Sequence, residues 1–431
     1  MSRIKQLIVY KNFEQGHILE NMTWIIDHYE NESHNIEEII SLFYKCMQDL
    51  VELAGNYGFE KNLWHNYLTY LLVNNENVFS TAWEIAGQVD GTINKLAQHD
   101  FEIFKELYEF DFTNIEQYLE ISCLRLIIDY QGVDGQSKVF NQRIRDRICT
   151  LSVKLGNAQH MDDFMEAIVS FYQDFGVGKL GLHKAFRVIH DPQGVHIVPI
   201  TRIAHVHLDD LVGYELAKQK LIENTEAFVQ GHRANNCLLF GDAGTGKSSS
   251  IKGILNRYYD QGLRIIELYR HQFQDLNEVI TQIKNRNYRF IIYMDDLSFE
   301  DFETEYKYLK AVIEGGLERK PENILIYATS NRRHLVREQF SDKEGRRDDL
   351  HSSDTVQEKL SLVYRFGMKI FFCAPDKREF ENIVKVLADR YGLDIPEEER
   401  LLEANKWELH NGGLSGRTAQ QFIDYLLGTE A

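Results

Sequence analysis

Over roughly the first 180 residues, apolar side chains recur at the three- and four-residue spacing of an amphipathic helix. The clearest stripe begins at Ile36, and Asn35 with Glu38 three residues later predicts a capping box at its start. Gly55 predicts its end. Shorter stripes follow, and they are rich in aromatic residues. The pattern therefore predicts a mostly helical N-terminal region whose aromatic stripes form its core.

Beyond about residue 185 the hydrophobic pattern changes to short apolar runs. Two of them, residues 186–189 and 195–200, flank Asp191-Pro192-Gln193-Gly194 and predict a β-hairpin. Five more runs alternate with helical stretches, which predicts a parallel sheet covered by helices on both faces. These runs are Cys237–Phe240, Arg264–Leu268, Phe290–Met294, Ile324–Ala328 and Met368–Phe372. From Pro375 onward the pattern is helical again.

We therefore expect an α/β protein with three domains, because 431 residues exceed what one core usually serves. Residues 1–197 are expected to form a mostly helical N-terminal domain that ends in the hairpin. Residues 198–375 would form an αβ core with a five-stranded parallel sheet, and residues 376–431 a small helical lid.

The loop after the first of the five strands carries the strongest functional signal. Gly241-Asp242-Ala243-Gly244-Thr245-Gly246-Lys247-Ser248 fits the phosphate-binding pattern G-x-x-x-x-G-K-[S/T]. Its glycines allow positive φ angles and close approach of backbone amides to a β-phosphate. The helix that follows, which includes Ser249, points its N-terminal dipole at the same anion. Lys247 would reach the β- and γ-phosphates and Ser248 would ligate Mg²⁺, so we predict an ATP site in a P-loop fold.

A pair of carboxylates, Asp295 and Asp296, follows the buried run 290–294. We expect this strand to lie beside the P-loop strand, so that Asp295 holds Mg²⁺ through water or the Ser248 hydroxyl. Asp296 would polarise the attacking water as a general base. Many ATPases of this type have glutamate at the second position. Aspartate is one methylene shorter, which leaves slow hydrolysis, or help from Glu300 or Asp301, open.

Three more polar residues are placed to act on the nucleotide. Asn331 follows the run 324–328, and its amide would position the water against the γ-phosphate, with Thr329 as the second choice. Arg365 directly precedes the fifth strand. From there it would project into a neighbouring subunit and stabilise charge on the transferred phosphoryl group. Arg417 opens the last predicted helix and would face the phosphates from the lid, where it would report ATP versus ADP.

The amino-acid composition restricts the classes of partner and the cellular compartment that we expect for this protein. The chain has 48 Lys and Arg against 66 Asp and Glu, and a net charge of −18 disfavours a general nucleic-acid coat. The basic window Arg332–Arg347 leaves a local nucleic-acid contact open, although acidic residues are interleaved with it. Five scattered cysteines without a C-x-x-C pair predict a reducing cytoplasm, and we interpret them as buried apolar residues. Five histidines within residues 183–207 lack the partner spacing of a metal site. No apolar run reaches the length of a membrane span.

Together these motifs resemble the AAA+ superfamily of ATPases. Leu208-Asp209-Asp210-Leu211-Val212-Gly213 matches the stretch that leads into such modules, and the resemblance implies that Val212 and Gly213 contact adenine. The chain is most similar to a bacterial AAA+ family catalogued only as a domain of unknown function, strongly over residues 198–428. The stretches that carry this similarity are Glu223–Thr225, Asn235–Asn236, Gly262–Arg264, Asp295–Glu300 and Tyr327–Leu335.

The resemblance implies ATP, ADP and Mg²⁺ as ligands, a homo-oligomeric ring and a protein partner that it does not identify. Ring unfoldases carry an aromatic–aliphatic–glycine pore loop after the second strand, but Tyr269–Leu276 has no glycine, which disfavours threading of a polypeptide. Our leading hypothesis is an AAA+ ATPase that remodels or loads a protein partner. An ATP-gated switch with negligible hydrolysis stays open. So does a small-molecule P-loop kinase, although a kinase has no use for both Arg365 and Arg417.

Overall fold

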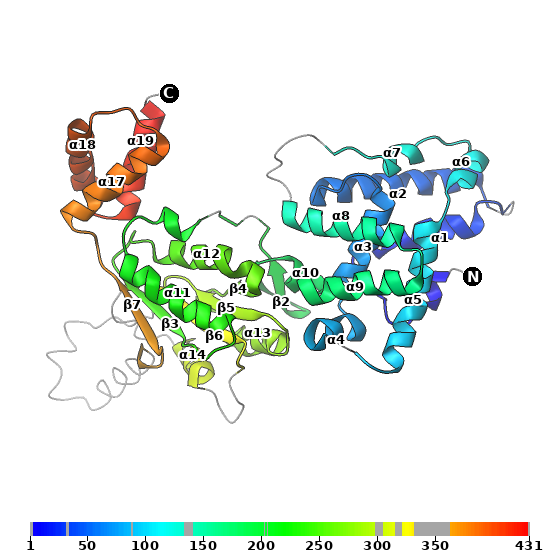
Figure 1. The fold of residues 1–431 in the computed structure, drawn as a ribbon, viewed down its shortest axis with the longest axis horizontal. Helices are drawn as coiled ribbons and strands as arrows, with labels where there is room; N and C mark the ends of the chain where they lie inside the picture. The colour runs from blue at the N-terminus through cyan, green and yellow to red at the C-terminus, as the bar shows by residue number, and fades with distance from the viewer. Residues whose placement is uncertain are drawn as a thin grey trace. The chain divides into compact units, whose positions relative to one another are not determined.

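The structure is a computed structural model that describes residues 3–31, 34–87, 89–132, 141–201, 203–204, 206–297, 305–314, 321–331 and 363–429 (Figure 1). The chain divides into two compact units, Met1–His183 and Lys184–Ala431. The boundary lies before the hairpin, whereas we expected the N-terminal domain to end in the hairpin, at residue 197. In the part of the chain that the structure describes, no helix has the length and hydropathy that crossing a bilayer requires.

The first unit is helical, as its hydrophobic stripes predict, and its apolar side chains form one core. Asn35 caps α2 through its side-chain oxygen, which accepts from the backbone N–H of Glu37. The helix continues past Gly55, the predicted end, to Gly58, whose φ of 71° suits a C-cap glycine. The helices are α1 Gly16–His28, α2 Ile36–Tyr57, α3 Leu63–Asn74, α4 Val78–Ala86, α5 Thr92–Glu109, α6 Thr113–Leu119, α7 Leu124–Ile128, α8 Gln142–Asn157, α9 Met161–Phe175 and α10 Gly178–Leu182.

The second unit is built on a seven-stranded sheet in the order β2-β1-β4-β5-β6-β3-β7. All neighbours are parallel except the hairpin pair β1 and β2. The strands are β1 Ala185–Asp191, β2 Gly194–Pro199, β3 Cys237–Gly241, β4 Leu263–Glu267, β5 Arg289–Met294, β6 Ile324–Ser330 and β7 Met368–Phe372. The α/β class and the parallel sheet are confirmed. The predicted count of five is too low because β1 pairs with β4, for example Phe186 with Ile266, and adds the hairpin to the sheet.

Helices cover both faces of the sheet, as predicted. Alternate strand residues, such as Leu239, Ile291 and Tyr327, form one core with α11 Glu215–Val229 and α12 Lys247–Tyr258. The residues between them point to the opposite face and are buried too. The remaining described helices of the core are α13 Leu276–Ile283 and α14 Glu305–Glu314, with short 3₁₀ turns at Leu208–Asp210, Tyr259–Gln261 and Arg270–Asp275.

Three C-terminal helices have a hydrophobic cluster of their own. They are α17 Lys377–Tyr391, α18 Glu397–His410 and α19 Gly416–Thr429. Asp376 caps α17 in a capping box with Glu379, and Gly392 ends that helix with a φ of 70°. We refer to these three helices, with the loops that connect them, as the lid.

The strand order corrects one expectation. We expected the acidic strand, β5, to lie beside the P-loop strand, β3, but β6 lies between them. Leu239 of β3 pairs with Thr329 of β6, and Met294 of β5 pairs with Ala328. Sequence spacing does not encode which strands pair, so this order had no local signal. Its consequence is that the end of β6 can contact both neighbours.

A buried hydrogen-bond network explains several of the stretches that the chain shares with the resembling family. The Asn224 side-chain amide donates to the Tyr327 hydroxyl and to the Asn235 carbonyl, each over 2.9 Å. The Thr225 hydroxyl lies 2.9 Å from the same tyrosine oxygen, and Asn236 accepts from the backbone N–H of Ile326. The network therefore fastens α11 and the start of β3 to β6, the strand that ends at the candidate site.

The cysteines and histidines only partly follow expectation. All five cysteines are free, and Cys46 and Cys237 are buried, but Cys373 is exposed and is not a core residue. His190 lies 3.0 Å from Asp275, and His196 lies 3.1 Å from Asp191. His205 lies outside the described residues.

Candidate nucleotide-binding site

The predicted phosphate-binding loop connects the end of β3 to the start of α12. Gly241, Gly244 and Gly246 have positive φ angles of 134°, 76° and 85°. A Cβ on Gly241 would lie 2.0 Å from the carbonyl oxygen of Phe372 in β7, and one on Gly244 would lie 2.8 Å from the Ser415 hydroxyl of the lid. The loop therefore needs glycine for both its backbone conformation and its close contacts.

Lys247 is held inside this loop. It is only 5% exposed, and its ammonium donates to the carbonyls of Gly241 over 2.9 Å and of Asp242 over 2.5 Å. Burial lowers the pKa of Lys247, and the nearby carboxylates of Asp242, Asp296 and Asp295 oppose that shift. The Thr245 hydroxyl donates to the Asp242 carbonyl over 2.8 Å and tightens the turn. The ammonium of Lys247, the first residue of α12, therefore lies against the backbone of the loop.

Asp295 accepts hydrogen bonds from two hydroxyl groups. The Ser248 hydroxyl donates to its Oδ1 atom over 2.8 Å, and the Thr329 hydroxyl donates to the same atom over 2.6 Å. Burial on its own would raise the pKa of Asp295, but the hydroxyl groups of Thr329, Tyr293 and Ser248, with the backbone N–H of Asp296, outweigh burial, so its pKa lies below the usual value. The carboxylate is therefore ionised beside the serine of the P-loop.

Asp296 occupies an unusual backbone position. Its φ of 49° is left-handed, which is costly for a residue with a side chain. The backbone N–H of Asp296 donates to the Thr329 hydroxyl oxygen over 2.9 Å, and that of Leu297 donates to the Thr329 carbonyl over 2.7 Å. The Asn331 amide donates to Asp296 Oδ1 over 2.8 Å. Thr329 and Asn331, at the end of β6, therefore hold the carboxylates of the two aspartates that follow β5.

The lid and the segment before α11 border the loop on its other sides. The backbone N–H of Arg417 donates to the Gly244 carbonyl over 3.1 Å, which places the start of α19 against the loop. Val212 packs on the hydrophobic cluster of the lid, and Leu211 lies beside Gly246. Gly213 has a φ of 85° and turns the chain into α11. Of the two residues named for adenine contact, Val212 thus lies against the lid and directly follows the leucine that lies beside the loop.

Arg365 is the one predicted site residue that the fold keeps away from the loop. Phe372, at the end of β7, pairs with Gly241, whereas Met368, at its start, pairs with Cys237. At roughly 3.3 Å per residue, these four steps span about 13 Å, and Arg365 lies three residues farther back. Arg365 is half-buried at the opposite edge of the sheet from the phosphate loop.

The predicted phosphate, magnesium and catalytic residues other than Arg365 gather at the carboxyl edge of the sheet: Gly241 through Ser249, Asp295, Asp296, Asn331 and Arg417. Glu300 and Asp301, the possible helpers of Asp296, and the basic window Arg332–Arg347 lie outside the described residues.

The sequence undervalued two residues of this site. Thr329 was only the second choice at the end of β6, yet its hydroxyl contacts both Asp295 and Asp296. Strand alternation puts residues 329 and 331 on one face, and that signal would have predicted both. The Asp242 carboxylate accepts from the backbone N–H of Ala374 over 2.8 Å and joins the loop to the end of β7. No local sequence pattern predicts that contact.

The donor set fits a nucleotide with a magnesium ion. The loop offers backbone N–H groups at a helix N-terminus together with a buried ammonium, which is the chemistry that binds phosphate. Ser248 and Asp295 bring a hydroxyl and a carboxylate oxygen within 2.8 Å of each other, and Mg²⁺ prefers hard oxygen ligands of this kind.

A known protein family matches the part of the chain that contains this site. Residues 181–430 match the family described as "Protein of unknown function (DUF815)". The chain belongs to this family. The DUF815 match begins just before the hairpin, includes every candidate site residue from Val212 to Arg417, and ends one residue after α19, the last helix of the lid. The similarity expected from the sequence, to a family catalogued by its unknown function, is confirmed. No curated protein matches the chain.

Several solved structures are similar to part of the chain. A RuvB mutant from Thermotoga maritima is 18% identical over 52% of this chain and 67% of its own, with a TM-score of 0.36. The RuvB Holliday junction branch migration motor from the same organism is 16% identical over 51% of this chain and 72% of its own, with a TM-score of 0.31. The FIGL-1 AAA domain in complex with ADP is 16% identical over 53% of this chain and 74% of its own, with a TM-score of 0.36.

Proposed function

We propose that the chain is an AAA+ ATPase that binds ATP with Mg²⁺ and hydrolyses it to remodel or load a protein partner. The observation that carries this proposal is the 2.8 Å contact between the Ser248 hydroxyl and Asp295, at the start of the P-loop helix. A serine of the loop and a strand-end aspartate are the two protein groups that hold Mg²⁺ in P-loop ATPases. Bound Mg²⁺–ATP would supply the transferable phosphoryl group and the cation that neutralises its oxygens.

The roles of the binding residues follow from their contacts. Lys247 would exchange its two carbonyl partners for β- and γ-phosphate oxygens, which are stronger acceptors because they are charged. The loop amides from Gly241 to Ser249 would surround the phosphates. Val212 and Gly213 would border the adenine, and Arg417 would approach the phosphates from α19.

Hydrolysis would depend on the pair at the ends of β5 and β6. Asp296 would accept a proton from the attacking water, and Asn331 would orient that water from the next strand. The hydroxyl of Thr329 would keep Asp296 in its strained conformation, since it accepts the aspartate's backbone N–H. Arg365 lies too far from its own loop to act there, so we propose that it serves the site of a neighbouring copy in a homo-oligomeric ring.

A second candidate, an ATP-gated switch with negligible hydrolysis, is favoured by one contact. The Asn331 amide donates to Asp296 Oδ1, so one oxygen of the proposed base is already hydrogen-bonded to the residue that would orient the water. The shorter aspartate at this position points in the same direction. In such a switch, the lid would respond to ATP through Arg417 without turnover.

The Asp296→Asn variant separates the two candidates. If the chain is an ATPase, the variant should bind ATP with unchanged affinity by calorimetry and lose about 100-fold or more in steady-state turnover, because it lacks the general base. Asp394→Asn, at an exposed carboxylate of the lid, is the matched control and should hydrolyse like the unchanged chain. Negligible turnover of the unchanged chain at every protein concentration, with tight ATP binding, would instead support the switch.

A further inference from the structure

Acidity is concentrated in the first unit. Residues 1–183 contain 14 Lys and Arg against 27 Asp and Glu, a net charge of −13 out of the chain's −18. None of the nucleotide chemistry lies in these residues, and the DUF815 match begins only at residue 181. The proposed nucleotide site therefore does not explain what this unit does.

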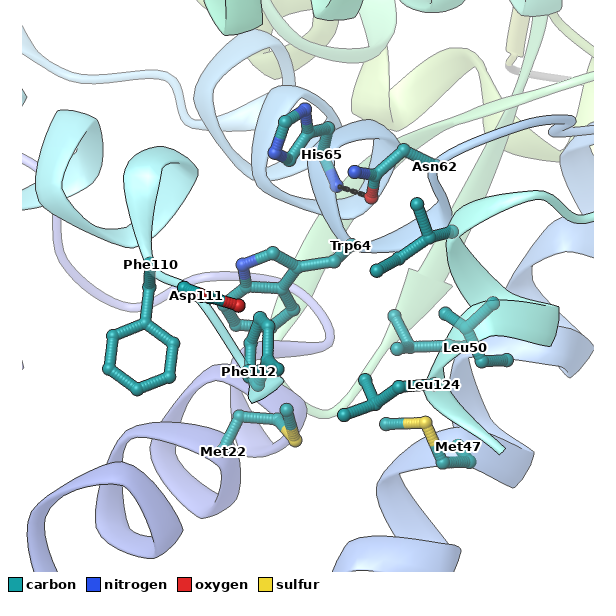
Figure 2. Close-up of a pocket in the computed structure, with 12 residues that line it drawn as sticks. Met22, Met47, Leu50, Asn62, Trp64, His65, Phe110, Asp111, Phe112 and Leu124 are labelled. Carbon is teal, nitrogen blue, oxygen red and sulfur yellow. Dashed lines mark hydrogen bonds between the residues drawn. The ribbon is translucent and has the colours of Figure 1, made fainter. Parts of the chain in front are cut away.

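The same unit contains a small, mostly apolar pocket that is partly open to solvent; Figure 2 shows the residues that line it. Its volume is about 80 Å³. Side chains from α1, α2, α3 and α7 and from the turn after α5 surround it. In Figure 2, Met22, Leu50 and Leu124 lie around the rings of Trp64 and Phe112. The flexible methionine side chains adapt to apolar groups of varied shape, which suits a surface that accepts a partner's side chain.

The edge of this pocket combines apolar and acidic groups. Ile128 lines the pocket and is 40% exposed, and Leu126 on the same short helix is 70% exposed. Asp111 also lines the pocket, and its carboxylate accepts from the backbone N–H and the hydroxyl of Thr113. The Thr113 hydroxyl lowers the pKa of Asp111, so the carboxylate is ionised at neutral pH.

Size and charge together restrict what the pocket can accept. Small-molecule sites are usually several hundred Å³, whereas about 80 Å³ accommodates a single aliphatic side chain. A phosphate-bearing ligand, a nucleic acid or an anionic membrane would be repelled by a unit of net charge −13. A second copy of the same acidic unit would be repelled for the same reason. A basic polypeptide segment is attracted.

We propose that this pocket is the docking site for a basic segment of the protein partner, which inserts one aliphatic side chain beside Trp64. The proposal rests on the proposed function, because it names the class of partner that the ATPase would act on. Long-range attraction would bring the basic segment to the acidic unit. The inserted side chain would then supply most of the binding free energy, as a buried anchor does in other protein interfaces.

The test uses the full chain and three fluorescein-labelled twelve-residue peptides, measured by anisotropy. One is rich in lysine with a central leucine, the second replaces that leucine with alanine, and the third replaces the lysines with glutamates. We expect the first to bind about tenfold more tightly than the second, since the pocket buries the leucine's additional carbons. The third should show no binding. Raising the salt concentration from about 0.05 M to about 0.5 M should weaken the first complex several-fold.

Two variants locate the binding. Ile128→Trp should block the pocket from its exposed edge and reduce affinity for the first peptide at least tenfold, whereas Val78→Trp, at a 76% exposed position outside the lining, should not. Asp111→Asn keeps the acceptor for Thr113 but removes the charge, and it should weaken binding roughly two- to fivefold. Asp162→Asn, at an exposed carboxylate of α9, is its control.

Calorimetry with ATP keeps this test separate from the nucleotide site. Ile128→Trp should bind ATP like the unchanged chain, because the pocket belongs to the other unit. Failure of both chains to bind ATP would contradict the proposed function while leaving the peptide result intact. Equal binding of the leucine, alanine and glutamate peptides, no binding of any of them, or full binding by Ile128→Trp would overturn the docking proposal.

Discussion

Thr329→Val is the substitution that tests the geometry of the site most closely. Valine has nearly the shape of threonine, and residue 329 is only 1% exposed, so the change removes a hydroxyl without opening a cavity. Two contacts are lost: the bond that the hydroxyl donates to Asp295 over 2.6 Å and the bond that it accepts from the backbone N–H of Asp296 over 2.9 Å. Asp296 then retains only a longer bond of 3.2 Å to Asp295 for that N–H.

The size of the effect follows from these two bonds. A hydrogen bond to a carboxylate contributes about 1.5–3 kcal/mol and a neutral one about 0.5–1.5 kcal/mol. Because Asp295 is open to solvent on one side, we take the lower part of each range and expect a loss of about 2 kcal/mol in the free energy of unfolding. The left-handed backbone of Asp296 costs about 1–3 kcal/mol, so the residue should relax once its restraint is gone.

Urea unfolding and steady-state ATP hydrolysis measure the two consequences. Turnover should fall at least about tenfold, which corresponds to 1.4 kcal/mol in the activation barrier, while KM for ATP should change little because Lys247 and the loop are untouched. Thr329→Ser keeps the hydroxyl and should stay within about threefold of the unchanged chain in turnover. If valine and serine variants are equal in stability and in turnover, the role assigned to this hydroxyl is wrong.

Two other predictions concern assembly and pH. Turnover per chain should rise with protein concentration, and Arg365→Ala should bind ATP but lose turnover. Mixing Arg365→Ala with Lys247→Ala should restore some activity, since an intact site and an intact arginine can meet at one interface. No recovery in the mixture would argue against a shared site. Asp295 has a folded-state pKa below its ordinary value of 3.8, so its stabilising bonds are fully present above that pH and are lost as the pH falls through the lower value. The difference in unfolding free energy between the unchanged chain and Asp295→Asn should therefore be constant near neutral pH and shrink in acid, and a pH-independent difference would count against those bonds.

Local signals predicted most of the elements. The strands of the core begin and end within about two residues of the apolar runs, because a run of β-branched and apolar residues bounded by polar ones has few alternatives to a buried strand. The P-loop was also predictable from a local pattern, because only glycine fits the backbone conformation and the close contacts at residues 241 and 244. Asn35 likewise predicted the start of α2, which its side chain caps.

The rest depended on contacts between residues far apart in the chain. Nothing in the hairpin sequence specifies that β1 pairs with β4, and nothing in β5 specifies that β6 separates it from β3. The importance of Thr329 follows from that strand order, because β6 pairs with β5 and brings the Thr329 hydroxyl to the Asp295 carboxylate and to the backbone N–H of Asp296. Gly55 shows the limit of a local stop signal, since α2 passes through it to reach Gly58.

The central claim is that the loop between β3 and α12 binds ATP, and calorimetric titration of Lys247→Ala with Mg²⁺–ATP tests it most directly. Lys247 is the buried ammonium inside the loop, so its removal should abolish ATP binding or weaken it at least about 100-fold. Lys252→Ala, at an exposed lysine of the same helix, should bind ATP like the unchanged chain. Unchanged ATP affinity in Lys247→Ala would contradict the account.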